Sequence, residues 1–267
     1  MSSVRNGVSA PFFDFWSPGI ILVSMENGHA YLDRGGFIVS ADDYGIRDAS
    51  AAILSLARAG KLDRVAVMAD RVSQADADAL VATGVAIDIH LELTRLVGSG
   101  ENGSAQGIRT VVNFASRFLS GRLSPRRVGG EWERQLERFE ELFGRKPDGW
   151  NVHEHYQYFP IFFRVLVGFV ERHGDGFVRF GKCGIFSGKR WTFTSFILGM
   201  LRFFCRPAFA RHPAPTTDYM ASFDWFSGRE DELFDRAPHG TVELVFHPER
   251  TEEKRWIEEH ITVKSPK

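Results

Sequence analysis

The stretch Phe37-Ile38-Val39-Ser40-Ala41-Asp42-Asp43-Tyr44-Gly45 decides the fold that we expect. Its first five residues form a short apolar run typical of a buried strand, and the last four favour a turn that ends it. Apolar residues then recur at helical spacing from Ile46 to Ala57, and Gly60 ends that segment. A buried strand followed at once by a helix is the repeating unit of a parallel α/β sheet.

The same alternation continues along the chain. Ser73, with Asp76 three residues later, predicts a capped helix that runs to Gly84. The alternation predicts an α/β fold with parallel strands and outer helices, either an open sheet or a closed barrel. The other predicted strands are Val65–Met68, Val85–Leu91, Trp150–His153, Phe177–Phe180 and Val242–Phe246. The other predicted helices are Val111–Leu119, Phe162–Glu171 and an amphipathic helix with Trp132, Leu136, Phe139, Leu142 and Phe143 on one face.

Composition excludes several classes of protein. The 267 residues include 33 basic and 34 acidic side chains, so a net charge of -1 gives no global reason to bind nucleic acid. Cys183 and Cys205 have no metal-ligand spacing and form no disulfide framework, which predicts a cytoplasmic protein. Residues 1–36 are expected to be a poorly ordered extension, and residues 37–267 a single domain. The chain has no nucleophile elbow, Walker A loop or dinucleotide-binding turn.

Polar residues follow the predicted strands, at the edge where parallel sheets place their active sites. Asp42 and Asp43 leave the first strand, and either they converge on one site or they cap the following helix. Strict alternation places Asp88, His90, Glu92 and Thr94 on one face of an extended segment. That face lines a cavity, unless the segment is a solvent-exposed edge strand.

The segment Asn151-Val152-His153-Glu154-His155 follows another strand and contains an HxH pair, a common spacing for metal ligands. With His90 and an aspartate, two imidazoles and one carboxylate would leave an open position for water, as in catalytic zinc sites. His247 ends the Val242–Phe246 strand and is either a core histidine or a general acid.

Taken together, these motifs resemble the YdjC-like carbohydrate deacetylases, a family that includes chitooligosaccharide and hopanoid-associated deacetylases. The matching segments occur in the family's order and lie between about Phe37 and Arg250. They are Ala41–Gly45 (ADDYG), His90–Thr94 (HLELT), Asn151–His155 (NVHEH) and Val242–Pro248 (VELVFHP).

The resemblance implies an irregular (β/α) barrel of the polysaccharide-deacetylase-like type and a divalent metal that activates water. Zinc suits the ligand types better, and magnesium is also described in the family. The implied reaction is hydrolysis of the N-acetyl group of an amino sugar. Asp43, His90 and His153 would then be the metal ligands, with Asp42 as general base and His247 as the acid for the leaving amine.

Further candidates for the site are His155, Asn151, Glu92 and Arg179. Asn151 stands where the family has Asp, which changes the charge around the site. Arg179 would bind a sugar hydroxyl or a phosphate, or form a surface salt bridge. The alternatives to a deacetylase are a catalytically impaired relative that binds a glycan or lipid, and a metal-dependent hydrolase of another bond such as a phosphoester.

The segment Trp191–Phe204 is the most apolar of the chain and is flanked by basic residues. It is too short to span a membrane. It predicts either a buried helix or an amphipathic helix that touches lipid, at the inner face of the membrane. The second alternative would suit a lipid-linked amino sugar as substrate. The oligomeric state stays open, with a homodimer among the alternatives.

Overall fold

A computed structural model describes residues 23–26, 29–32, 36–97, 121, 123–174, 176–183, 193–226, 228, 230, 233 and 240–263. The predicted helix Val111–Leu119 lies outside these residues. Eight strands form one sheet in which every neighbouring pair is parallel. In sheet order they are β7 (Phe177–Val178), β6 (Gly149–Val152), β5 (Ala86–Leu91), β4 (Arg64–Val67), β3 (Phe37–Tyr44), β10 (Val242–Phe246), β9 (Tyr219–Ser222) and β8 (Lys182–Cys183).

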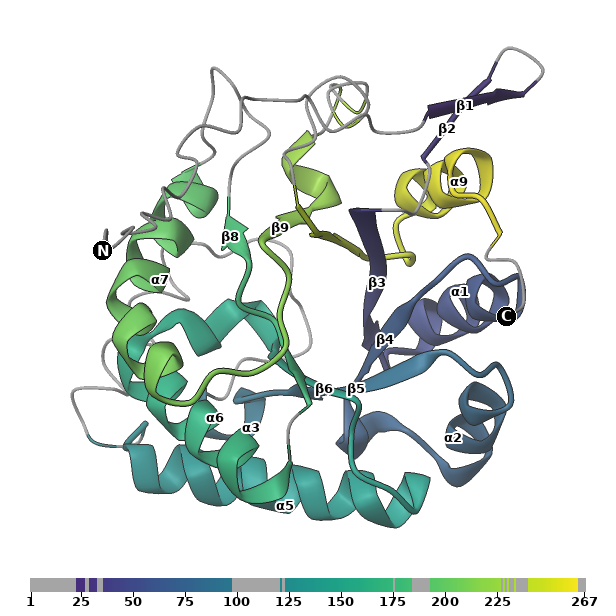
Figure 1. Ribbon diagram of the computed structural model, residues 1–267. Coiled ribbons are helices and arrows are strands. Elements are labelled where there is room, and N and C mark those ends of the chain that lie inside the picture. Colours follow the sequence, from purple (N-terminus) through teal and green to yellow (C-terminus); the bar gives the residue numbers. More distant parts are fainter. Residues whose placement is uncertain are drawn as a thin grey trace, which may run out of the picture.

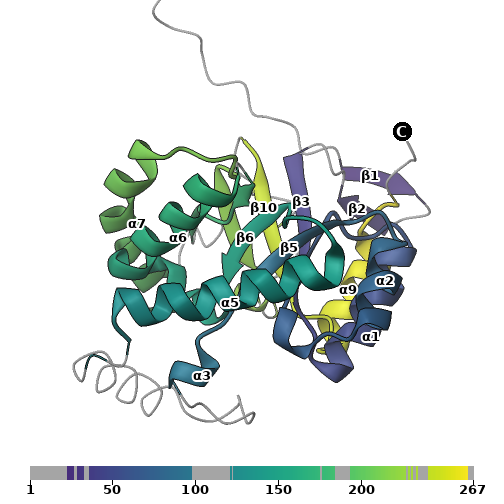
Figure 2. The same ribbon diagram turned by 90° about the horizontal axis from the view of Figure 1, so that it is seen from below.

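The helices surround the sheet, as the alternating pattern predicts (Figure 1). They are α1 (Arg47–Arg58), α2 (Gln74–Val81), α3 (Thr94–Val97), α5 (Pro125–Phe143), α6 (Pro160–His173), α7 (Phe193–Arg211) and α9 (Thr251–His260). Figure 2 shows α5 running across one side and α7 lying outside α6. The predicted α/β fold with parallel strands and outer helices is therefore confirmed, and the sheet curls as in a deacetylase-like barrel.

The curl of the sheet follows from its connectivity. β7 and β8 lie at opposite edges of the sheet, yet only residues 179–181 separate them on the chain. Those residues can bridge about 14 Å at most. A flat sheet of eight strands would place its edges about 34 Å apart. The two edges must therefore approach each other, and the segment Phe177–Cys183 joins them.

Local sequence signals explain how several elements begin and end. Ser73 and Asp76 form the predicted capping box at the start of α2, in which each side chain bonds the other's backbone N–H. α5 begins with Pro125 and ends at Gly144, whose φ of 63° is the left-handed conformation that glycine adopts without strain. Its apolar face buries Trp132 and Phe139 completely against the core.

Some expectations about the elements are wrong. The turn predicted at Asp42–Gly45 begins only at Gly45, because β3 continues to Tyr44 through an irregularity in its pairing with β4. β8, β9 and α9 were not predicted, and β8, with two residues, is too short to show a period. In the N-terminal extension, β1 (Val23–Glu26) and β2 (His29–Leu32) form an antiparallel pair that the sequence did not predict.

Candidate active site

The candidate residues lie at the carboxyl ends of four strands. β3 supplies Asp42 and Asp43, β5 supplies His90, and β6 and β10 are followed by His153 and His247. β5 lies between β4 and β6 and is buried almost throughout, so the alternative of an exposed edge strand is wrong. Parallel strands bring their carboxyl ends to the same side of the sheet, which gathers these side chains at one place.

An irregularity in β3 separates the two adjacent carboxylates. The pairing of β3 with β4 shifts register between Ala41 and Tyr44, and Asp43 has a φ of 71°. A left-handed conformation at a residue other than glycine is strained and is concentrated at functional sites. It directs Asp43 to the histidines and Asp42 to Arg179. The alternative that the pair caps α1 is wrong, because Ile46 occupies the cap position.

Asp43, His90 and His153 form a group whose ligand atoms could hold one metal ion. Oδ1 of Asp43 lies 3.0 Å from Nδ1 of His153 and 3.3 Å from Nε2 of His90. The two ring nitrogens are 3.2 Å apart. Burial alone raises the pKa of Asp43, but the adjacent rings of His153 and His90 hold it well below its ordinary value.

Asn151 fixes the orientation of the His90 ring. The two residues are paired in the register of β5 and β6, and Oδ1 of Asn151 faces Nδ1 of His90 within hydrogen-bonding distance. The amide oxygen can only accept, so Nδ1 carries a proton, and in the neutral ring Nε2 then carries the lone pair. Supporting contacts of this kind are typical around metal-binding histidines.

These contacts test whether the group suits a cation. In the neutral ring the lone pair on Nε2 of His90 would point toward Oδ1 of Asp43, which is buried without a hydrogen-bond donor of suitable geometry. An imidazole lone pair and a carboxylate oxygen repel each other unless a proton or a metal ion lies between them. One carboxylate and two imidazoles also match the ligand set of catalytic zinc. The residues present therefore fit a divalent metal.

Asp42 belongs to a buried group of three charges. Both of its oxygens accept from Arg179, at 2.6 and 2.8 Å, and Arg179 also donates to Glu243 at 2.9 Å. All three side chains are buried, so Arg179 is not in the surface salt bridge that its sequence also allowed. Burial raises the pKa of Asp42, but Arg179 and His90 more than offset this effect and keep it ionised. Arg179 lies in the short link that joins the two edges of the sheet.

His155 lies apart from the candidate metal ligands. Glu154 and His155 both have left-handed backbones, with φ of 54° and 57°, so the segment is not extended as the HxH pattern assumed. Its ring lies near those of Tyr158 and Trp225, and Nδ1 is buried without a hydrogen-bond partner. Burial and the charge of Arg179 lower the pKa of His155 to about 4, so the ring is neutral at pH 7.

His247 lies close enough to Asp42 and His155 to lower the pKa of both. Its backbone N–H donates to Oε2 of Glu253 at 2.7 Å, which fixes the chain after β10. Its Nδ1 is buried without a hydrogen-bond partner among the described residues. His247 therefore belongs to the same group of side chains as Asp42 and His155.

Glu92 lies beside the site but is held by other residues. Its carboxylate accepts from Arg71 at 3.1 Å and from Thr94 at 2.8 Å. Gln135 of α5 bonds both the N–H and the carbonyl of Glu92. Sequence reasoning missed Arg71, which lies four residues after the end of β4, in the 3₁₀ turn Ala69–Arg71.

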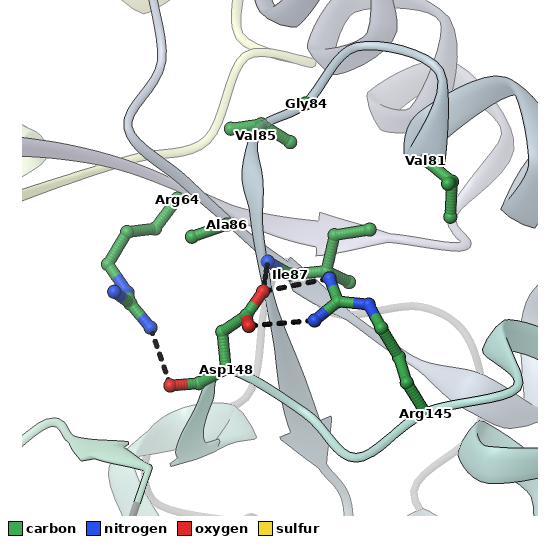
Figure 3. Close-up of a pocket in the computed structure, with 8 residues that line it drawn as sticks. All are labelled: Arg64, Val81, Gly84, Val85, Ala86, Ile87, Arg145 and Asp148. Atoms are coloured by element: carbon green, nitrogen blue, oxygen red, sulfur yellow. Dashed lines mark hydrogen bonds and ion pairs between the residues drawn. The ribbon is translucent and has the colours of Figure 1, made fainter.

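The described residues also form a pocket of about 480 Å³ at the opposite end of the sheet (Figure 3). It is lined in part by Arg64, Arg145 and Asp148, which lie at or before the beginnings of strands. There Arg145 binds Asp148 through two hydrogen bonds, and Arg64 donates to the Asp148 carbonyl. Asp88 pairs with Arg64 at this end of the sheet. Its alternation with His90 had placed it on the same face as the candidate site, but it lies away from that site.

Comparison with known proteins supports the resemblance found in the sequence. The sequence model of a family described as YdjC-like protein matches residues 36–267. No protein with a curated description is similar enough in sequence to count as a match. A solved structure of a proposed cellobiose-phosphate cleavage protein from Enterococcus faecalis is similar, with a TM-score of 0.52. The sequences are 15% identical, and the similarity covers 79% of each chain, so it supports the fold alone.

Proposed function

Because the chain belongs to the YdjC-like family, we propose that it is a metal-dependent hydrolase that removes an acetyl or other acyl group from the nitrogen of an amino sugar. The observation that carries this proposal is the meeting of Asp43, His90 and His153. These ligand types leave a coordination position open for water, as amide hydrolysis requires. Zinc is the metal that the two imidazoles favour.

In the proposed reaction, water adds to the amide carbonyl carbon and the C–N bond breaks to release a carboxylic acid and an amine. A divalent ion held by Asp43, His90 and His153 would lower the pKa of water and polarise the carbonyl group. Asp42 is the base that takes the proton of the water. It is ionised because the charge of Arg179 more than offsets the rise in its pKa that burial causes. His247 donates a proton to the departing nitrogen, which leaves poorly as an anion.

The charges around the site favour an amide over a phosphoester. A phosphoester substrate needs cations that are available to its oxygens. Arg179 is adjacent to Asp42, but the carboxylates of Asp42 and Glu243 occupy its guanidinium group. Arg71 donates one hydrogen bond to Glu92. The name of the Enterococcus structure alone is no reason to prefer a phosphorylated substrate.

A catalytically impaired relative is the second candidate function, and Asn151 is the feature that suggested it. In the structure Asn151 contacts His90 and not the position of the base, which Asp42 holds. Replacing an aspartate by Asn at this position removes a charge behind a ligand without removing the ligand's hydrogen bond. This geometry therefore supports an active enzyme with altered metal affinity.

The test is to purify the full chain without chelators, measure its metal content and assay acetate release. The substrates are N-acetylglucosamine oligosaccharides and lipid-linked N-acetylamino sugars. We expect bound metal and acetate release in the wild type, and loss of both in Asp43→Ala. Asp78→Ala, on the exposed side of α2, is the matched control and should behave as the wild type. Wild-type protein that binds no metal, or acetate release that survives Asp43→Ala, would contradict the proposal.

A further inference from the structure

Helix α7 has an apolar inner face that packs on the barrel. Leu198 and Cys205 are buried, and the ring of Phe209 lies 4.6 Å from that of Phe180 and 6.3 Å from that of Phe163. Cys205 also contacts the carbonyl of Tyr158, with its sulfur 3.2 Å from the oxygen. This face accounts for the attachment of the helix to the rest of the fold.

The outer face of α7 is apolar as well. Phe196, Met200, Phe203 and Phe204 follow the i, i+4, i+7, i+8 spacing of one helical stripe, and between 46% and 62% of each is exposed. Among the described residues, the other large hydrophobic side chains with this degree of exposure are the separate Val81 and Val263. A contiguous exposed apolar stripe on one helix marks an interaction surface.

Positive charge borders the C-terminal half of this stripe. α7 contains three arginines and no acidic residue, in a chain whose net charge is -1. Arg206 and Arg211 are exposed beside the stripe, and Arg164 of α6 is exposed nearby, where its charge acts on Cys205. Arg202, by contrast, turns inward and donates to the carbonyl of Phe180. Phenylalanines with a basic border are typical of helices that lie on anionic lipid.

We propose that the outer face of α7, formed by Phe196, Met200, Phe203 and Phe204 with Arg164, Arg206 and Arg211 at its border, docks on the surface of an anionic bilayer. The aromatic rings enter the headgroup region and the guanidinium groups bind lipid phosphates. No helix in the described part of the chain is long and apolar enough to cross a membrane. A second copy of the chain fits less well, because a symmetric interface would bring the same arginines together.

The docking face lies close to the candidate site. Tyr158, which contacts Cys205 of α7, belongs to the 3₁₀ turn His153–Tyr158 that carries two of the candidate histidines. A helix is about 10 Å in diameter, so a docked bilayer lies about one helix away from this turn. Docking itself does not depend on the proposed hydrolase activity. The inference that the amino sugar is lipid-linked rests on both proposals.

The test is flotation of the full chain with vesicles of phosphatidylcholine, with or without phosphatidylglycerol. We expect binding to the anionic vesicles that weakens with salt. Phe203→Ser with Phe204→Ser should lower the partition coefficient about tenfold or more. Arg206→Gln with Arg211→Gln should lower the partition coefficient about 30-fold on vesicles that contain phosphatidylglycerol and leave it unchanged on pure phosphatidylcholine. Val81→Ser with Val263→Ser is the matched control and should bind as the wild type.

Circular dichroism and thermal unfolding establish that each variant is folded. Asp43→Ala should float as the wild type does, so failure of the proposed chemistry and failure of docking are distinguishable. The proposal is overturned if the wild type does not bind anionic vesicles or if the Phe203/Phe204 variant binds equally well. It is also overturned if sedimentation shows a dimer that this variant dissociates while vesicles bind neither form.

Discussion

Asn151 and His90 face each other across β5 and β6, with the amide oxygen directed at Nδ1 of the ring. The pairing leaves Nε2 as the atom that His90 presents to Asp43. Asn151 is thus a positioning residue. Its contact with His90 requires only an acceptor oxygen, which the carboxylate of an aspartate would also provide.

Replacing Asn151 should change metal affinity without unfolding the protein. Asn151→Leu removes the acceptor and should weaken metal binding about 10- to 100-fold, whereas Asn151→Asp should bind at least as tightly as the wild type. Competition with a fluorescent chelator measures both affinities. Gln74→Leu, whose amide lies on α2, is the control. Equal affinities in Asn151→Leu and the wild type would show that the contact does not orient the ligand.

Metal should stabilise the folded chain through its three candidate ligands. An ion that binds only the native state adds about 2.7 kcal/mol at a free concentration 100 times its dissociation constant. Zinc should therefore raise the melting temperature of the chelator-treated wild type but not that of His153→Ala. His212→Ala, at an exposed histidine, should respond as the wild type does. A zinc-dependent shift of the same size in His153→Ala would place the bound metal elsewhere.

Arg179 should be far more important for stability than a surface arginine. Arg179→Met leaves the buried carboxylates of Asp42 and Glu243 uncompensated and should cost about 3–5 kcal/mol. Arg138→Met breaks an ion pair in which both side chains are exposed and should change stability by about 0.5 kcal/mol or less. Urea unfolding measures both.

Arg179→Lys provides a milder variant that is expected to fold. It keeps the charge but loses the two parallel hydrogen bonds to Asp42, so its stability should lie between those of the wild type and Arg179→Met. If Arg179→Met and Arg138→Met were equally stable, the buried charges would not interact as the distances indicate.

The two cysteines should make the protein less stable at alkaline pH. Burial raises the pKa of Cys183 from 9.0 to about 11 and that of Cys205 from 9.0 to about 12. Above pH 9 the unfolded chain releases these protons while the native chain keeps them, so stability falls as pH rises. Cys183 alone should contribute on the order of 1 kcal/mol of this loss at pH 10, and Cys205 adds to it in the same direction.

Burial also raises the pKa of Tyr44, Tyr156 and Tyr158, so these tyrosines add to the decline near pH 10. The cysteine contribution is therefore the difference between the wild type and a variant that lacks both cysteines. Denaturant unfolding at pH 8, 9 and 10 should show the decline in the wild type and a flatter profile in Cys183→Ala with Cys205→Ala. A thiol reagent should react with the native protein slowly, since both cysteines are buried. A decline of the same size in the double variant would assign it to other groups.

The sequence predicted the sheet and the location of the candidate site because both depend on local patterns, whereas the choice of Asp43, His90 and His153 as ligands came from the family resemblance. Strands such as Val242–Phe246 are visible as short apolar runs, and polar residues at their ends mark the active edge. The three candidate ligands come from three such strand ends. No long-range information is needed to see that parallel strands place these residues at the same edge.

The remaining features depend on backbone conformation and on contacts between distant parts of the chain. The left-handed backbones of Asp43 and His155 determine whether each side chain lies among the candidate metal ligands or apart from them. The identities of these residues do not predict this backbone conformation. Arg179 and Asp42 are 137 residues apart, so their pairing could not be inferred from spacing. The two apolar faces of α7 were ambiguous for a related reason, because a buried helix and a surface-binding helix have similar compositions.

The link between the two edges of the sheet has a consequence for folding. Arg179 lies in that link, so Asp42 gains its partner only when the segment Phe177–Cys183 has joined β6 to β9. Contacts of such large sequence separation form late and slowly. In a chain that has assembled only its first strands, the carboxylate of Asp42 has no partner. Burying it at that stage would cost free energy, which disfavours a compact intermediate. We therefore expect closure of the barrel and the pairing of Asp42 with Arg179 to occur in the same folding step.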